Sequence, residues 1–328
     1  MKTETIAIIS HSGDIDGIAS AFLLKEAFKV QLKNIFFVNY GEEDLAYVEK
    51  EIRKLAKKGK LSVLISDLSA DGRSMETFSR ILEIANRSGG NLSWFDHHPW
   101  GVDAIRKIAS RCKIAIVGEN SKFCATEIVY RKFFKKDAFL DMLAEMVHYS
   151  DFNIRPDDEG TRKIVGYYAL GITYYNTASS RSVVDSKMRS IIATLEKKRL
   201  YDKKIADAAR TFEKVNSKRI KRMSRKLYLI GSELAVGFST DIQSTQACAS
   251  IIEASGRDVG VYINIRNGKG HIRSVKSNTS MLARSLGGNG HPHASGFKLD
   301  LKEYNNFRSE SDKKRVVELI IEKSRKVL

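Results

Sequence analysis

Cysteines, prolines and long apolar runs are scarce in this chain of 328 residues. No apolar run approaches the roughly 20 residues that cross a bilayer, and the apolar part of the N-terminal stretch is too short for a signal peptide core. The three cysteines, Cys112, Cys124 and Cys248, leave an odd count without metal-binding spacing, which is typical of small buried thiols in a reducing compartment. We therefore expect a cytoplasmic protein that does not associate with membranes.

Acidic residues are also under-represented, because 39 Asp and Glu face 56 Lys and Arg, a formal net charge of +17. This charge favours polyanions as partners, nucleic acid before anionic lipid. A Lys-rich surface of the kind found in heat-adapted proteins is the alternative. Residues 197–226 hold thirteen basic and three acidic residues with no Pro or Gly, which predicts a basic helical segment. Its exposed side is either a solvated face or a track for a phosphate backbone.

The apolar pattern indicates an α/β fold of more than one domain. Strands alternate with helices from residue 6 to residue 147, which predicts a parallel sheet covered on both faces. Strand and helix patterns resume after the basic segment and predict a smaller α/β domain. The expected division is an N-terminal domain at residues 1–185, a basic helical linker at 186–225 and a C-terminal domain at 226–328.

Histidine is rare and unevenly distributed. None lies in the Lys-rich stretch between residues 185 and 226, and Pro99 and Pro292, two of the three prolines, directly follow histidines. Each histidine lies in a short stretch with an Asp, an Arg or a glycine cluster. This distribution favours a catalytic or ligand-binding role for the histidines over a generic polar role. The seven are His11, His97, His98, His148, His271, His291 and His293.

An expected strand ends in Asp96-His97-His98-Pro99. Open α/β sheets bind ligands at the carboxyl ends of their strands. One acid beside two imidazoles offers a divalent metal an oxygen and two nitrogen ligands, a mixture that Mn²⁺ and Zn²⁺ accept. A surface or capping pair is the alternative for these histidines taken alone.

Three more acids follow expected strands. Asp14 and Asp16 follow the first strand and point the same way in extended backbone, and Asp67 follows another strand. An Asx turn, with Gly17 left-handed and Asp16 capping the next helix, is the alternative for the first pair. Because parallel strands end at one edge of a sheet, we expect these acids to lie beside His97.

A glycine-rich segment, residues 287–296, predicts an anion site in the C-terminal domain. Glycines let backbone N–H groups approach one anion, and His291 and Arg273 supply charge for the same anion. A flexible hairpin is the alternative for the glycines alone.

In their order these motifs resemble those of the DHH phosphoesterase family, including its RecJ-like and nanoRNase-like members, with the DHH-associated C-terminal domain and its Gly-Gly-Gly-His signature. The resemblance covers nearly the whole chain. It implies a catalytic N-terminal domain, a substrate-binding C-terminal domain and two divalent ions, usually Mn²⁺ with Mg²⁺ or Co²⁺ as alternatives, in the cleft between the domains. A bridging water made acidic by both ions would attack the phosphorus.

The resemblance also assigns residues to roles. One ion would be held by His11, Asp14 and Asp67, and the other by Asp16, His97 and Asp151 with Asp67 as the bridge. Asp67, His97 and His98 would be catalytic, with Asp96 orienting the histidines. The substrate phosphate would be gripped by Arg273, Ser274, Gly288, Gly290 and His291.

Two positions depart from the family pattern. Two residues, Ser12 and Gly13, separate His11 from Asp14 where the family has one, so metal binding by His11 depends on a bulge at Gly13. Asn289 replaces a glycine of the C-terminal signature, a mild change because Asn tolerates left-handed backbone. Without the resemblance, Asp151 is expected in a plain turn after a helix.

The short chain resembles oligoribonucleases and phosphatases of 3′-phosphoadenosine 5′-phosphate more than long-strand exonucleases. The expected function is Mn²⁺-dependent hydrolysis of short oligonucleotides, with short single-stranded RNA or DNA or a nucleotide as substrate. The alternatives are a RecJ-like single-strand exonuclease, a cyclic or linear dinucleotide phosphodiesterase, and a nucleic-acid-binding DHH protein without turnover. Homodimer formation is left open.

Overall fold

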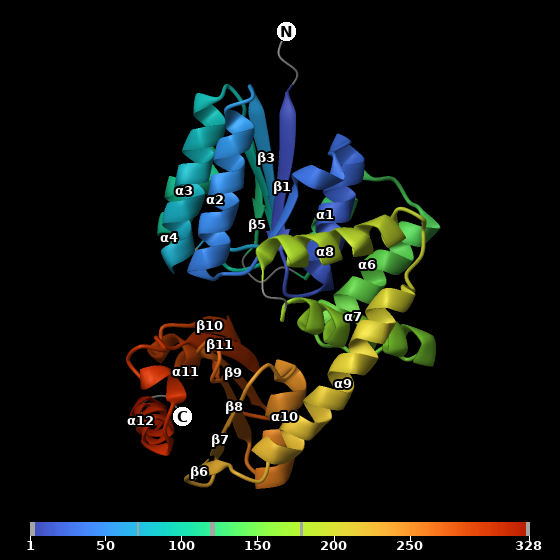
Figure 1. Ribbon diagram of the computed structural model, residues 1–328. Coiled ribbons are helices and arrows are strands. Elements are labelled where there is room, and N and C mark those ends of the chain that lie inside the picture. Colours follow the sequence, from blue (N-terminus) through green and yellow to red (C-terminus); the bar gives the residue numbers. More distant parts are fainter. Residues whose placement is uncertain (1–3, 71, 119–121, 178–179, 326–328) are drawn as a thin grey trace. The chain divides into compact units, whose positions relative to one another are not determined.

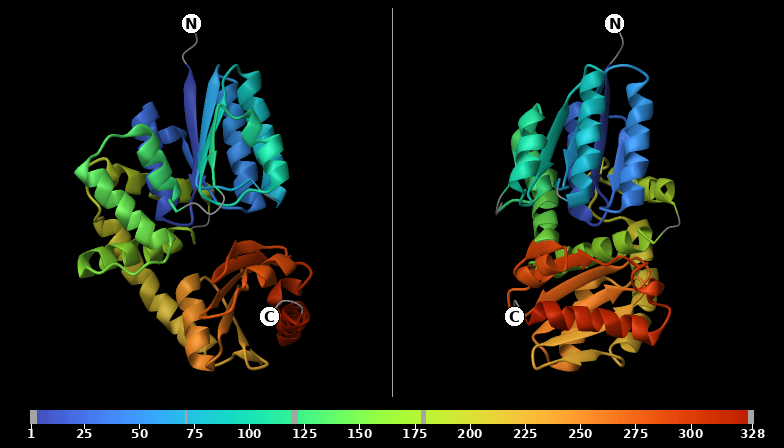
Figure 2. Two further views of the ribbon diagram at one scale, coloured as in Figure 1. Left: turned by 180° about the vertical axis from the view of Figure 1, so that it is seen from behind. Right: turned by 90° about the vertical axis from the view of Figure 1, so that its left-hand side faces the viewer.

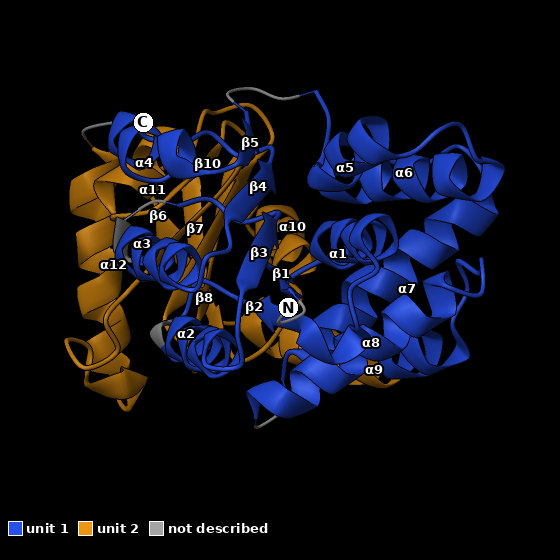
Figure 3. Cartoon of the chain, turned by 90° about the horizontal axis from the view of Figure 1, so that it is seen from above, with its two compact units in different colours: residues 1–210 blue, residues 211–328 orange. Residues whose placement is uncertain are grey.

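The computed structural model describes residues 4–325 except 71, 119–121 and 178–179. The chain divides into two compact units, residues 1–210 and 211–328 (Figure 3). The division falls within α9 (Lys203–Met223), inside the segment that the sequence assigns to a separate linker. No helix in the described part of the chain is long and apolar enough to cross a membrane.

Unit 1 is built on the predicted parallel sheet, whose strand order is β2-β1-β3-β4-β5. Alternate residues of one strand enter different cores, because successive side chains point to opposite faces. Ile8 packs with the helices on one face, whereas Ala7 and Ile9 pack with those on the other. The strands are β1 (Thr5–His11), β2 (Ile35–Val38), β3 (Leu61–Ser66), β4 (Leu92–Asp96) and β5 (Ile114–Val117).

Two helix layers cover this sheet (Figures 1 and 2). One layer consists of α2 (Glu42–Ala56), α3 (Gly72–Arg87) and α4 (Val102–Lys107). The other consists of α1 (Ile15–Phe28), α5 (Ala125–Phe133), α6 (Ala138–Asp151), α7 (Glu159–Tyr175) and α8 (Arg181–Leu195). Both faces are therefore buried, as the continuous apolar strands require.

The local sequence pattern misses two features of this helical layer. Helix α7 contains three glycines and several β-branched residues and tyrosines, so its propensity is low. Its helix is maintained by packing, since Tyr168 and Ile172 are fully buried in the core. The basic stretch is broken between α8 and α9, where Asp202 accepts hydrogen bonds from the Lys204 N–H and the Thr194 hydroxyl.

Unit 2 is the predicted second α/β fold. Its mixed sheet has the order β10-β11-β9-β8-β7-β6, with only the β7–β8 pair parallel among the described strands. Helix α10 (Ser244–Ser255) packs on one face, and α11 (Ser280–Ser285) and α12 (Glu310–Ser324) pack on the other. The strands are β6 (Tyr228–Ile230), β7 (Leu234–Ser239), β8 (Val259–Asn264), β9 (Lys269–Ser274), β10 (Asn289–His291) and β11 (Ala294–Lys298).

Candidate metal centre

The predicted acids and histidines of unit 1 meet at the carboxyl edge of its sheet. His11 ends β1, Asp67 directly follows β3, and His97 directly follows β4. Parallel pairing in register brings these strand ends side by side. Asp151 reaches the same place as the last residue of α6, so the plain turn that the local sequence allows is not what forms there.

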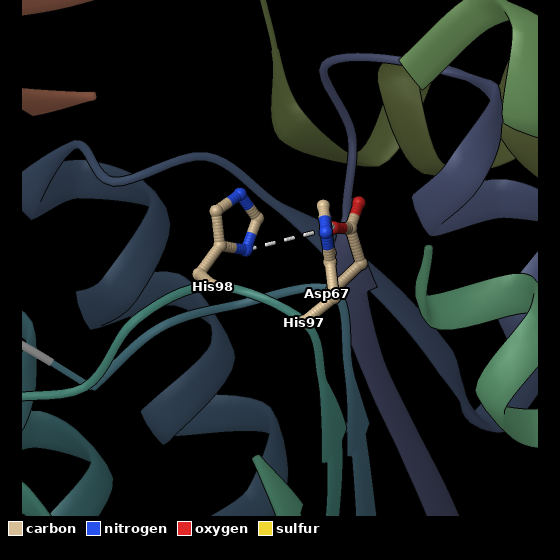
Figure 4. Close-up of side chains that lie close together, drawn as sticks. All are labelled: Asp67, His97 and His98. Atoms are coloured by element: carbon tan, nitrogen blue, oxygen red, sulfur yellow. Dashed lines mark ion pairs between the residues drawn. The ribbon is translucent and has the colours of Figure 1, made fainter. Parts of the chain in front are cut away.

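Asp67 lies beside His97 and His98 (Figure 4). Its Oδ2 is 3.5 Å from His11 Nδ1, and its Oδ1 is 3.6 Å from His97 Nε2 and 3.9 Å from His98 Nδ1. The carboxylate thus has one oxygen toward His11 and the other toward the His97-His98 pair. This is the arrangement that a bridging ligand between two sites requires.

Among the residues that the structure describes, three groups of side chains have ligand atoms that all lie within 4.8 Å of one another. The groups are His11, Asp14 and Asp67; Asp16, His97 and Asp151; and Asp67, His97 and His98. The first two groups have the same members as the two ligand sets that the family resemblance implies. His11 Nδ1 is 3.3 Å from Asp14 Oδ2, and His97 Nε2 is 3.5 Å from Asp151 Oδ2.

The backbone of Asp67 is left-handed, with a φ of 53°. This conformation is uncommon for a residue other than glycine and costs on the order of 1–3 kcal/mol. The Asp67 N–H donates to the Phe95 carbonyl at 3.0 Å, which holds the residue at the end of the sheet. Strained backbone of this kind is frequently found where a side chain must be aimed at a ligand.

The longer first motif brings His11 into the cluster. A Cβ added to Gly13 would lie 2.5 Å from the His11 imidazole, so the loop passes directly against the ring. Outside the predicted set, Asn176 donates from Nδ2 to the Ser12 carbonyl at 2.6 Å, and the Tyr40 ring lies 5.8 Å from the His11 ring. No local motif marks Asn176 or Tyr40, because each comes from a different part of the chain.

The Asx-turn alternative for the first loop is correct only in part. Asp14 caps α1 by accepting the N–H groups of Asp16 and Gly17, whereas Asp16 does not cap that helix. Gly17 is required for space and not for left-handed backbone, since a Cβ there would lie 2.2 Å from the His11 carbonyl oxygen.

Asp16 is held by the N-terminus of α5. Its two carboxylate oxygens accept the N–H groups of Ala125 at 2.8 Å and Thr126 at 2.7 Å, and its carbonyl accepts the Thr126 hydroxyl. Free N–H groups and the helix dipole both favour a negative charge there. Backbone donors leave no motif, so the sequence does not reveal this contact.

Asp96 contacts the second histidine of the motif. It is fully buried, lies 2.7 Å from His98 Nδ1 and accepts a hydrogen bond from the Trp100 indole at 2.8 Å. The Asp96 carboxylate therefore fixes the His98 ring while the side chain of His98 remains about one third exposed.

The buried acids and histidines of this cluster strongly shift one another's pKa values. Burial, followed by repulsion from Asp67, raises the pKa of Asp16 to about 7, and burial together with Asp16 raises the pKa of Asp151 to about 8. Burial by itself would lower the pKa of His97, but the carboxylates of Asp67, Asp151 and Asp16 raise it to about 10. Several acids this close share protons unless other positive charge is present.

Two buried polar atoms in the cluster lack a hydrogen-bond partner, Asp67 Oδ2 and His97 Nε2. Buried groups in this state are costly, at about 1–3 kcal/mol each. A divalent cation would satisfy both atoms and balance the carboxylates. Oxygen and imidazole donors suit Mn²⁺, Mg²⁺ or Zn²⁺, so the residues fit a metal centre.

In unit 2 the predicted anion-binding residues lie around strands β9 to β11. Ala294 pairs with Arg273 on one side and with His291 on the other, so these two residues lie on one face of the sheet, roughly 10 Å apart at their Cα atoms. Arg273 donates to the Thr245 hydroxyl at 2.9 Å. Ser274 Oγ lies 3.1 Å from His293 Nδ1 and donates to the Ser277 carbonyl.

The glycine-rich segment forms a β-hairpin within the sheet, in which Pro292 and His293 make the turn between β10 and β11. A Cβ on Gly288 would lie 1.9 Å from the Gly296 carbonyl oxygen, and one on Gly290 would lie 2.5 Å from the Ser295 Cα. Gly290 also has a φ of 139°. These glycines are therefore needed for close packing of β10 on β11.

No protein-family model and no curated protein matches the chain. Among solved structures, the pGpG-specific phosphodiesterase PggH of Vibrio cholerae is 14% identical with a TM-score of 0.52, over 97% of this chain and 99% of that one. An exopolyphosphatase-related protein of Bacteroides fragilis is 16% identical with a TM-score of 0.49, over 98% and 92% of the two chains. RecJ of Thermus thermophilus, solved with Mg²⁺, is 14% identical with a TM-score of 0.46, over 99% of this chain and 50% of that one. The likeness to PggH shows a common fold, which fits the DHH-type α/β architecture that the motifs predict.

Proposed function

We propose that this chain is a metal-dependent phosphodiesterase that hydrolyses short oligonucleotides. The observation that carries the proposal is the buried cluster around Asp67, in which carboxylates and imidazoles converge while Asp67 Oδ2 and His97 Nε2 lack partners. Added positive charge stabilises such a cluster when its acids are ionised, and phosphoryl transfer is a reaction that such charge promotes.

The cluster has room for two ligand sets that share Asp67. The first set is His11, Asp14 and Asp67, and the second is Asp16, His97 and Asp151 with Asp67. When bound, two divalent cations, with Mn²⁺ as the first choice, supply Lewis-acid activation of water and neutralise charge on the phosphate. The N-terminus of α5 orients Asp16 for this role, and the strained backbone orients Asp67.

His98 is the residue of the cluster best placed to act on the substrate. Asp96 engages its Nδ1, which leaves Nε2 for another partner. Burial opposes the protonated form, but Asp96 raises the pKa of His98 to about 9, so the ring holds a proton at neutral pH. We assign to His98 Nε2 a hydrogen bond to a phosphate oxygen, or a proton for the departing oxygen.

Unit 2 would supply the grip on the substrate. Arg273 and His291 lie on one sheet face, and Arg273 suits bidentate contact with a phosphate. Ser274 directly follows Arg273, and Gly288 and Gly290 lie just before His291. These three residues complete the proposed phosphate site.

The favoured substrate is a linear dinucleotide or a slightly longer strand. The fold likeness to a pGpG-specific phosphodiesterase covers nearly all of both chains, which supports a substrate of that size. A long single strand is the second candidate, since the net charge of +17 favours extended polyanions.

The test is hydrolysis of 5′-labelled RNA and DNA of two, five and twenty-four nucleotides, pGpG, a cyclic dinucleotide and 3′-phosphoadenosine 5′-phosphate, each with Mn²⁺ and with EDTA. Asp67→Asn is the matched inactive variant. We expect rapid loss of the dinucleotides and slow attack on the long strands. Processive digestion of the long strands would assign the protein to the exonucleases. Absence of any metal-dependent cleavage would leave a binding protein without turnover.

A further inference from the structure

The C-terminal part of α9 and the turn that follows it form a basic segment in unit 2. Residues 214–226 contain seven lysines and arginines and no acidic residue. Unit 2 as a whole holds 22 basic and 11 acidic residues, so it carries +11 of the net charge of +17 in just over a third of the chain. The excess charge of the molecule is therefore concentrated and not spread evenly.

Six of these seven cations are exposed, four on α9 itself and two, Arg225 and Lys226, in the turn that follows Met223. Within the helix, Lys214, Lys218 and Lys221 are spaced by four and three residues, which places them in one row. The opposite side of α9 is buried through Phe212, Asn216 and Met223, but the row itself faces solvent. We call the exposed cations the α9 basic row; its members are Lys214, Lys218, Lys221, Arg222, Arg225 and Lys226.

A general Lys-rich surface does not explain this row. Helix α12 in the same unit has four basic and four acidic residues, and its Lys313 and Lys323 pair with acidic neighbours. Within the described residues, no member of the α9 basic row forms an ion pair. Uncompensated like charges on one helix face repel one another, which costs stability unless an anion binds.

We propose that the α9 basic row is a docking track for the phosphate backbone of a single-stranded nucleic acid. From Lys214 to Arg222, eight residues further along the chain, the helix rises by about 12 Å. A strand that rises about 3.4 Å per nucleotide places three or four phosphates along that length. The length of the row therefore matches a short stretch of phosphate backbone. The row would contact phosphates only, so binding would not depend on the base sequence.

An anionic membrane is the other polyanion that such a row would attract, and the structure favours nucleic acid. A helix that lies on a membrane inserts an apolar face between the lipids. Most apolar side chains of α9, such as Phe212 and Met223, are already buried within the protein, and Val215 is 41% exposed. A single exposed valine offers no apolar face for insertion, whereas the cations of the α9 basic row are exposed, as a backbone track requires.

The test is binding of a fluorescein-labelled RNA of twenty-four nucleotides to the full chain, measured by anisotropy in EDTA so that no turnover occurs. The test variant is Lys214→Gln/Lys218→Gln/Lys221→Gln. The matched control, Lys298→Gln/Lys302→Gln/Lys314→Gln, removes the same charge from three exposed lysines elsewhere in unit 2 that form no ion pair within the described residues. Far-ultraviolet circular dichroism and thermal unfolding check that both variants fold.

At about 50 mM salt we expect the test variant to bind at least tenfold more weakly, while the control stays near wild type. The slope of log affinity against log salt should fall in magnitude by roughly 2 in the test variant, because each phosphate contact on a single strand contributes about 0.7. Wild-type affinity in the test variant, an equal loss in the control, or no RNA binding by the wild type would each overturn the proposal. So would row-dependent binding to phosphatidylserine vesicles in place of RNA.

This inference rests on the proposed function for the class of ligand, but the two fail separately. Row-dependent RNA binding by a chain that cleaves nothing would refute the phosphodiesterase and keep the track. Cleavage of dinucleotides by a chain whose RNA binding ignores the row would refute the track and keep the phosphodiesterase.

Discussion

At the scale of single residues, Asp67 combines a left-handed backbone with a buried carboxylate that lies between His11 and His97. Backbone strain of this kind is retained where the surrounding structure holds it and the position of the side chain serves a function. Because Asn tolerates left-handed backbone, it is the substitution that changes the charge and keeps the conformation.

We expect Asp67→Asn to lower Mn²⁺ affinity and the hydrolysis rate by at least about a hundredfold, since loss of a single outer partner of a metal site already costs about ten- to a hundredfold. Calorimetric titration with Mn²⁺ and dinucleotide hydrolysis would measure these losses, and thermal unfolding in EDTA would report on folding. Metal binding at wild-type strength in the folded variant would contradict the bridging role of Asp67.

Asp96 acts on His98 through one short contact of 2.7 Å. In Asp96→Asn the negative charge is lost, so the pKa of His98 should fall from about 9 toward or below its ordinary value of 6.5. Nuclear magnetic resonance titration of the His98 ring in the metal-free protein measures this shift. An unchanged His98 titration in the variant would show that other charges set its pKa.

At the scale of elements, the β1–α1 connection positions His11 and Asp14 in the cluster. Gly17, in the first turn of α1, allows the helix to pack closely against the end of β1. Gly17→Ala would put a methyl group 2.2 Å from the His11 carbonyl oxygen, a backbone clash that a flexible side chain cannot relieve. We expect a loss of at least about 2 kcal/mol in the stability of unit 1. Thermal unfolding and metal titration would report the effect.

Gly166→Ala in α7 is the matched control. Apart from its chain neighbours and the backbone of its own helix, no heavy atom lies within 4 Å of its added Cβ, and the position is helical. Alanine there should stabilise the helix by roughly 0.5–1 kcal/mol. If Gly17→Ala unfolds at the same temperature as wild type, the tight packing of the first loop is not needed for folding.

The sequence predicts the strands and the strand-end acids because both depend on local patterns. Buried parallel strands appear as continuous apolar runs, and their ends share one edge whatever the later topology. Helix α7 and the orientation of Asp16 by α5 were not predictable in this way. The first depends on packing of Tyr168 and Ile172, and the second on backbone N–H groups over a hundred residues away.

At the scale of the whole molecule, charge is divided between the two units. The members of the metal cluster lie between His11 and Asp151, all in unit 1, whereas the α9 basic row lies in unit 2. A divalent cation should therefore stabilise unit 1 and leave the unfolding of unit 2 unchanged. Calorimetry of the full chain can separate the two when they melt at different temperatures.

The folding stability of the metal-free protein should decrease as the pH rises. Asp16 and Asp151 have pKa values of about 7 and 8 in the folded chain, compared with 3.8 ordinarily. The folded state then holds more protons than the unfolded state between about pH 4 and 8, so its stability falls as the pH rises through that range. His97 and His98, with pKa values of about 10 and 9 compared with 6.5, extend the fall above pH 6.5.

Mn²⁺ should therefore raise the melting temperature of unit 1 more at pH 8 than at pH 6, because it binds the deprotonated ligands and replaces the protons that they lose. At a hundred times the dissociation constant, a single site adds about 2.7 kcal/mol, or roughly 5–10 °C for a unit of this size. The measurement is scanning calorimetry with EDTA or Mn²⁺ at both pH values, with Asp67→Asn as the control in which the shift disappears. A larger Mn²⁺ effect at pH 6, or an equal effect in that variant, would place the cation outside the Asp67 cluster.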